Sequence, residues 1–208
     1  MNNQLLYVEG GDDINFVEEL LKRRKIEKQF GIERSGGLQN LKKTLPVLIE
    51  TASYETIGVI VDADENIKSR WEEIREILVG NGYENVPQKL TPKGLILEDM
   101  DLPKVGIWIM PNNQVEGILE DFVSYLVDEN DELFPIAQKA VGDLLKNGKA
   151  RFNQNNKAKA TIHTWLAWQK RPELSLSMAV SHQHLKNYIL DDKKASDFVN
   201  WLQKLFKK

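Results

Sequence analysis

Three carboxylates stand where a folded chain could hold a metal ion. Asp62 and Asp64 directly follow an apolar, β-branched run at residues 56–61, and Glu9 follows a second apolar run at residues 4–8. Carboxylates that are held close together repel each other and raise one another's pKa values, and a divalent cation relieves this conflict. Oxygen-only ligands suit Mg²⁺ or Mn²⁺. We therefore expect these acids to form a magnesium or manganese site.

The two apolar runs are typical of strands that are buried on both faces of a parallel sheet. In such sheets, ligands bind at the carboxyl ends of the strands. Glu9 and the Asp62/Asp64 pair would meet there if the two strands are neighbours. Residues two apart in a strand share a face, so Asp62 and Asp64 can point the same way. Gly10 and Gly11 have no side chains, which lets a phosphate or an ion approach the backbone.

Each of the remaining acids near these motifs can have one of two roles. Asp13, together with Asp12, can contact a substrate or can simply cap the helix that follows. Glu120 and Asp121 begin a predicted helix after a strand-end loop, so they can add carboxylates to the metal site. Their alternative role is that of acids favoured by the dipole at a helix N-terminus.

The first half of the chain alternates strands and helices, which predicts an α/β fold. Its apolar patterns predict strands at residues 4–8, 30–34, 56–61, 94–97 and 105–110, and helices at residues 12–21, 38–49 and 66–80. This order implies right-handed crossovers and a mainly parallel sheet with helices on both faces. Either Asn66 or Ser69 opens the third helix. The last two strands form a pair joined by an acidic loop, added at a sheet edge.

After residue 127 the strand signals fade. Helices are predicted at residues 135–145, 158–168, 177–188 and 195–206. Trp165, Trp168 and Trp201 supply large apolar surface, and we expect them to anchor the core. The expected division is an α/β core at residues 1–127 and a C-terminal helical extension at residues 128–208 that packs on the core.

Composition excludes several classes of protein. The chain has 208 residues and no cysteine, which excludes disulfides and thiolate zinc sites. No apolar run approaches the roughly 20 residues of a membrane span, and the N-terminus lacks the pattern of a signal peptide. We therefore expect a cytoplasmic protein without membrane association. The net charge of −3 argues against simple coating of nucleic acid, although Lys157 and Lys159 can contact phosphates as point charges.

The two acidic motifs together resemble those of a Toprim domain. Val8-Glu9-Gly10-Gly11-Asp12-Asp13, followed by Val61-Asp62-Ala63-Asp64, is similar to the glutamate and the Asp-x-Asp that follow the first and third strands of that domain. The resemblance covers residues 4–125 and makes the expected core at residues 1–127 Toprim-like. Toprim domains form the catalytic core of topoisomerases, bacterial primases, ribosomal-RNA maturation nucleases and OLD-family nucleases. The segments at residues 117–121 and 159–165 also resemble small stand-alone Toprim-like proteins, a likeness that brings no activity with it.

The resemblance implies a role for each acid. Glu9 would be the general acid/base or a first metal ligand, and Asp62 and Asp64 would hold Mg²⁺ against a phosphodiester. Asn66 stands where topoisomerase-like members have a third aspartate. Glu120 and Asp121 could replace that missing carboxylate. The three histidines, His163, His182 and His184, show no ligand spacing with the acids.

Phosphodiester hydrolysis on DNA or RNA is the expected reaction. Strand passage needs a positioned tyrosine and large additional domains, and primases carry a cysteine-bearing zinc module that this chain lacks. An ATPase, as in OLD-type nucleases, is a candidate partner, and both the need for such a partner and the oligomeric state are left open. One alternative is a Toprim-like module that binds metal or nucleic acid without turnover. Another is a receiver-like phosphoacceptor at Asp62. Receivers need a lysine after the fifth strand, and residues 109–111 do not include one, which argues against this alternative.

Overall fold

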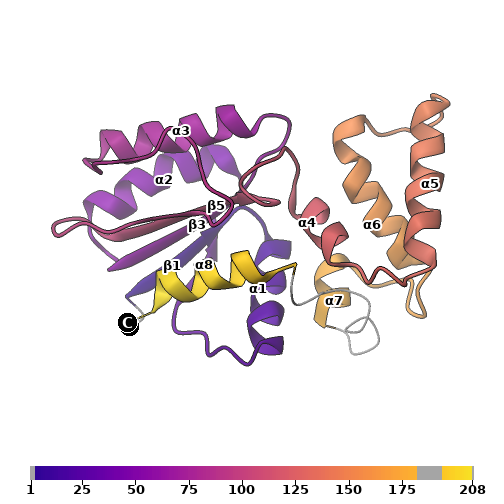
Figure 1. Cartoon of the computed structure of the whole chain (residues 1–208), viewed down its shortest axis with the longest axis horizontal. Helices are drawn as coiled ribbons and strands as arrows, with labels where there is room; N and C mark the ends of the chain where they lie inside the picture. Colours follow the sequence, from indigo (N-terminus) through magenta and orange to yellow (C-terminus); the bar gives the residue numbers. More distant parts are fainter. Residues whose placement is uncertain (1–2, 182–193, 208) are drawn as a thin grey trace.

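The computed structural model describes residues 3–181 and 194–207 and contains one five-stranded sheet (Figure 1). The strand order is β2-β1-β3-β5-β4. Four strands run parallel, and β4 pairs antiparallel with β5 at the edge. The strands are β1 (Gln4–Val8), β2 (Gly31–Arg34), β3 (Thr56–Asp62), β4 (Leu95–Leu97) and β5 (Lys104–Met110). The predicted α/β class, the mainly parallel sheet and the edge pair are confirmed.

Helices cover both faces of the sheet, as predicted (Figure 1). Alternate residues of β3 point to opposite sides: Val59 packs in the core under α2 and α3, and Ile60 packs in the core shared by α1 and α8. Asp62, two residues after Ile60, therefore leaves the strand on the side of α1. These helices are α1 (Gly11–Arg23), α2 (Leu38–Glu50), α3 (Ile67–Gly80) and α8 (Ser196–Phe206).

The C-terminal helix α8 packs directly on the sheet because two strands present glycine to it. A Cβ on Gly106 of β5 would lie 2.5 Å from Leu205 Cδ2, and one on Gly58 of β3 would lie 2.9 Å from the same atom. Trp201 of α8 donates from Nε1 to the carbonyl oxygen of Leu95 at 2.9 Å. The expected boundary at residue 127 stays a prediction.

The remaining helices lie beyond the carboxyl ends of the strands (Figure 1). Trp165 is fully buried there and donates from Nε1 to Asp131 Oδ1 at 3.0 Å. Trp168 is 42% exposed, so its predicted role as a core anchor is wrong: it follows the end of α6 and faces solvent. This layer contains α4 (Leu119–Leu126), α5 (Leu133–Lys146), the 3₁₀ turn η1 (Gln154–Asn156), α6 (Lys157–Ala167) and α7 (Leu176–Ser181).

Helix bounds follow local signals closely. Asn66 is the N-cap of α3, and its side chain accepts the N–H of Ser69 at 3.0 Å, which decides between the two predicted starts. The helix predicted at residues 177–188 is seen as α7 up to Ser181, and its remainder lies outside the described residues. Within the described part of the chain, no helix combines the length and apolarity needed to cross a membrane.

Candidate active site

The strand order places Glu9 beside Asp62. Strands β1 and β3 are parallel neighbours, with Val8 opposite Ile60, so the residues after Val8 meet the carboxyl end of β3. The backbone N–H of Asp62 donates to Glu9 Oε2 at 3.2 Å. Two acids that are far apart in the sequence are therefore joined directly at the carboxyl edge of the sheet.

Asp62 lies at the electrostatic centre of this acidic cluster. Its Oδ1 accepts the N–H of Leu119, the first residue of α4, at 3.0 Å. Burial raises the pKa of Asp62 well above its usual value, and the neighbouring carboxylates raise it further. Those carboxylates belong to Asp13, Glu9, Glu120 and Asp64. The structure thus brings four of the five other predicted site acids within electrostatic reach of Asp62.

Helices α1 and α4 begin with the same capping arrangement. The N-cap residues are Gly10 and Ile118, and the acid at the third helical position of each helix reaches back to the N-cap N–H. Asp13 Oδ2 accepts from Gly10 at 2.8 Å, and Asp121 Oδ2 accepts from Ile118 at 2.9 Å. Asp13 therefore does cap its helix, but from inside the first turn rather than as the N-cap residue.

Burial changes the acidity of both capping aspartates. It raises the pKa of Asp13 to about 7, with a smaller contribution from Glu9 and Glu120, although the hydrogen bond from Gly10 opposes the shift. Burial also raises the pKa of Asp121, against the hydrogen bond from Ile118. The carboxyl group of Asp13 therefore changes its protonation state near neutral pH.

Asp64 lies two residues after Asp62, beyond the end of the strand. Its φ of +51° lies in the left-handed region, and its backbone pairs with Gly117 through two N–H···O bonds of 2.9 Å. Its carboxylate forms an ion pair with Arg70 of α3. Sequence reasoning missed Arg70, because nothing in its spacing separates it from an ordinary helix cation.

Gly117 is required by this local geometry. Its φ is +140°, and a Cβ there would lie 2.7 Å from Asp121 Oδ2. A side chain at this position would therefore disturb both the pairing with Asp64 and the start of α4.

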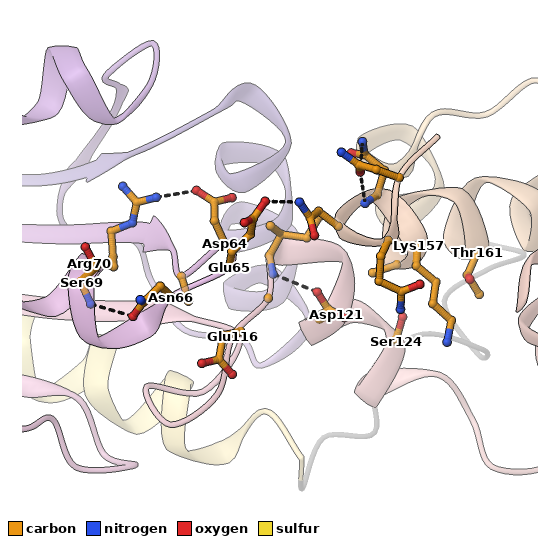
Figure 2. A pocket seen from close by; sticks show the side chains of 18 of the residues that line it. Asp64, Glu65, Asn66, Ser69, Arg70, Glu116, Asp121, Ser124, Lys157 and Thr161 are labelled. Carbon is orange, nitrogen blue, oxygen red and sulfur yellow. Dashed lines mark hydrogen bonds and ion pairs between the residues drawn. The ribbon is translucent and has the colours of Figure 1, made fainter. Parts of the chain in front are cut away.

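A polar pocket of about 1330 Å³ opens beside the cluster (Figure 2). It lies between the segment after β3, the start of α4 and the turn before α6. Figure 2 shows Asp64 and Arg70 on one side and Lys157 and Thr161 on the other. Of the predicted site residues, Asp64, Asp121 and Lys157 line the pocket. Glu65 and Asn155 form a hydrogen bond that links the strand-end segment to η1.

The two predicted phosphate contacts differ in their surroundings. Lys157 is exposed and lines the pocket. Lys159 Nζ lies 3.4 Å from Glu120 Oε1, and that carboxylate is only 6% exposed. Lys159 therefore offsets the charge of a buried acid from the cluster. Around Gly11 there is open space, since a Cβ there would have no neighbour within 4 Å.

The cluster fits a hard divalent cation by its donors but does not present a finished cage. All of its donors are carboxylate oxygens, and their mutual repulsion favours a counter-ion. Among residues 3–181 and 194–207, no group of three or more His, Cys, Asp or Glu side chains is arranged to hold a metal ion. Asp64 points to Arg70, which removes one expected donor from the group. His163 is exposed on α6, and His182 and His184 lie outside the described residues.

Comparisons with known proteins place the chain in a family. The model of the family "Protein of unknown function (DUF3226)" matches residues 3–207, and the chain belongs to this family. Solved structures of the C-terminal region of the Xanthomonas campestris pv. campestris OLD protein, phased with mercury and with iodine, match with 12% and 11% identity and a TM-score of 0.40. In both comparisons the match covers 96% of this chain and 98% of the other. No curated protein matches the chain.

Proposed function

We propose that this member of the DUF3226 family is a Mg²⁺- or Mn²⁺-dependent nuclease that hydrolyses phosphodiester bonds in DNA or RNA. The observation that supports this proposal is the grouping of Glu9, Asp13, Asp62 and Glu120 at the carboxyl ends of β1 and β3. The burial of Asp62 raises the pKa of its carboxyl group well above its usual value, and the charges of the neighbouring acids raise it further. A partly buried set of repelling carboxylates at the ligand-binding edge of a parallel sheet is typical of a functional site.

Each acid has a distinct task in this proposal. Asp62 and Asp64 hold the cation, with Asp121 and Glu120 nearby as further donors. When bound, the cation offsets charge on the phosphate and lowers the pKa of a water molecule. Glu9 Oε2 accepts the N–H of Asp62, which fixes the carboxylate and leaves Oε1 to take a proton from the attacking water.

Lys157 is proposed to contact the nucleic acid. It is exposed at the pocket, so its ammonium group can reach a phosphate next to the scissile bond. The acids near it outnumber the cations, so we expect binding of a polyanion to depend on the divalent cation.

The test is cleavage of labelled single-stranded DNA, duplex DNA and structured RNA by the full chain, with Mg²⁺, Mn²⁺ or chelator. Glu9→Gln and Asp62→Asn should each lower the rate by at least about 100-fold, the usual scale for loss of acid–base or metal-binding groups. Glu76→Gln, at an exposed position of α3, is the matched control and should cleave normally. Metal-dependent cleavage that survives both site variants would refute the assignment.

A binding module without turnover is the second candidate. It is favoured by the position of Asp64, whose carboxylate is paired with Arg70 instead of joining the other donors. This function predicts salt-dependent gel shifts of intact nucleic acid in Mg²⁺, with no cleavage products. Asp62→Asn would then weaken binding, and the nucleic acid would stay full length in every reaction.

A further inference from the structure

Arg70 is a buried cation with an incomplete set of partners. Its side chain is 9% exposed, yet Nε and Nη1 have no hydrogen-bond partner among the described residues. Its Nη2 donates a hydrogen bond to Asp64 Oδ2. A buried guanidinium with free donors is costly, so a position with a second acceptor should lie close in free energy.

That second acceptor is Glu73, one turn further along α3. Its Oε2 already forms a long ion pair with Arg70 Nη1, at 4.0 Å, which is too long for a hydrogen bond. Lys42 Nζ, from α2, lies 3.5 Å from Oε1 of the same glutamate. A guanidinium carries five donors on a flexible stem, so a small movement toward Glu73 would leave Arg70 paired even without Asp64.

Asp64 is well placed to exchange partners. Its backbone is fixed by the pairing with Gly117, while its side chain is 52% exposed. Asp64 and Arg70 line the pocket (Figure 2), and so does Glu73, so an ion from solvent can reach the group. In this arrangement Arg70 occupies the carboxylate of Asp64, one of the expected metal ligands.

We infer that Arg70 is an internal counter-ion that occupies Asp64 in the absence of metal and transfers to Glu73 when a divalent cation binds Asp64. The inference rests on the proposed function, since it takes Asp64 as a metal ligand. Arg70 is a positioning residue in this scheme: it competes with the cation and thereby sets the metal affinity. Glu73 acts through Arg70 by receiving it.

The test is a double-mutant cycle read out by Mn²⁺ binding to the full chain, measured by calorimetry without nucleic acid. Arg70→Gln should tighten binding by about fivefold or more, the scale of losing one competing ion pair. Glu73→Gln should weaken binding by a similar factor, because Arg70 then has no second carboxylate with which to pair when it leaves Asp64. Arg75→Gln, which removes an arginine paired with Glu72 on the same helix, is the control and should change little.

The cycle separates this exchange from a general effect of charge. If Glu73 acts through Arg70, then Glu73→Gln should have almost no effect in a chain that already carries Arg70→Gln. Additive effects in the double variant would overturn the inference, because simple removal of charges predicts additivity. Arg70→Lys provides a variant that keeps the charge and should bind Mn²⁺ more weakly than Arg70→Gln does.

A spectroscopic measurement on the wild-type chain gives a readout that does not depend on variants. The Arg70 Nε–H resonance should shift during a Mg²⁺ titration, and the Arg75 resonance should not. An unchanged Arg70 resonance at saturating metal would overturn the exchange. If Mn²⁺ binds and the cycle is coupled, but no nucleic acid is cleaved, the exchange stands and the nuclease proposal fails. If no variant binds metal, the metal site itself is refuted.

Discussion

Asp13 shows how a single residue can serve two purposes in this protein. Its carboxylate closes the first turn of α1 through the N–H of Gly10, and it also adds a charge to the buried acidic cluster. The cap stabilises the helix, while the charge repels Asp62 and costs stability. Buried carboxylates that repel one another are common at functional sites, in agreement with the function proposed above.

The repulsion predicts how stability depends on pH. The pKa of Asp13 rises from 3.8 to about 7 on folding, so the native state holds the proton more tightly. The penalty for ionising Asp13 is therefore absent below about pH 4, grows as the pH rises, and is complete above about pH 7. Asp13→Asn keeps an oxygen that can accept the Gly10 N–H and removes the charge. In chelator it should exceed the wild type in stability at pH 8, by up to about 4 kcal/mol, and lose this advantage by pH 4.

Urea unfolding at pH 4, 6 and 8 measures this difference directly. Asp12→Asn, at the neighbouring half-exposed position, is the control and should track the wild type. An Asp13→Asn curve that stays parallel to the wild-type curve across this range would contradict the raised pKa.

At the level of elements, the site depends on close contact between helices and strand ends. The start of α4 donates an N–H to Asp62, and the start of α1 places Asp13 beside it. Both helices begin at the carboxyl edge, so their positive dipole ends face the acids. On the α1 side of the sheet, α8 fills the remaining surface and holds β3 and β5 through the contact of Leu205 with their glycines.

That contact predicts a destabilising effect of a small substitution. In Gly106→Ala the new Cβ would lie 2.5 Å from Leu205 Cδ2, and Leu205 is fully buried and has no room to move aside. We expect a loss of about 1–3 kcal/mol in the free energy of unfolding, typical of overpacking. Gly31→Ala on β2, whose Cβ would have its nearest neighbour at 3.8 Å, is the matched control and should be close to neutral.

Thermal and urea unfolding of the two glycine variants test this prediction. If Leu205 is the cause, Leu205→Ala should lose its own contacts but make Gly106→Ala harmless in the same chain. A Gly106→Ala protein with wild-type stability would show that α8 does not press on β5.

For the whole molecule, the last helix determines whether the sheet domain is complete. Helix α8 comes from the predicted extension, yet its buried Phe198, Trp201 and Leu205 belong to the same core as β1, β3 and β5. The carboxyl ends of the strands face the helices α4 to α7 (Figure 1), and buried residues of those helices, such as Phe122 and Trp165, belong to the same core. The sheet that carries the site is therefore stabilised by contacts between β1, near the start of the chain, and α8, near its end.

Removal of α8 should abolish cooperative folding. A chain ending at residue 195 would expose the part of the sheet that α8 covers and lose several large side chains, each worth about 2 kcal/mol when buried. Circular dichroism during urea unfolding should show a broad transition or none, whereas removal of residues 207 and 208 alone should change little. A chain ending at residue 195 that unfolds at the wild-type midpoint would show instead that α8 is an accessory to an independent core.

Hydrophobic patterning by itself determines the elements and their order along the chain. Buried strands and amphipathic helices are local patterns, so the strands β1 to β5 and a start of α3 at either Asn66 or Ser69 follow from neighbouring residues, and the alternation of strands with helices predicts the parallel sheet. The proximity of Glu9 to Asp62 could also be predicted from the sequence, because it depends only on β1 and β3 being neighbours. Their roles in catalysis stay predictions.

Only the tertiary structure decided which charged groups are paired and which surfaces are covered. The pairing of Asp64 with Arg70 depends on a left-handed turn held by Gly117, and the pairing of Lys159 with Glu120 depends on how α6 docks near α4. The exposure of Trp168 and the close packing of α8 depend on contacts between distant segments. Sequence spacing carries the periodicity of one element, but the direction of a side chain past its end and its partner in space are set by long-range packing.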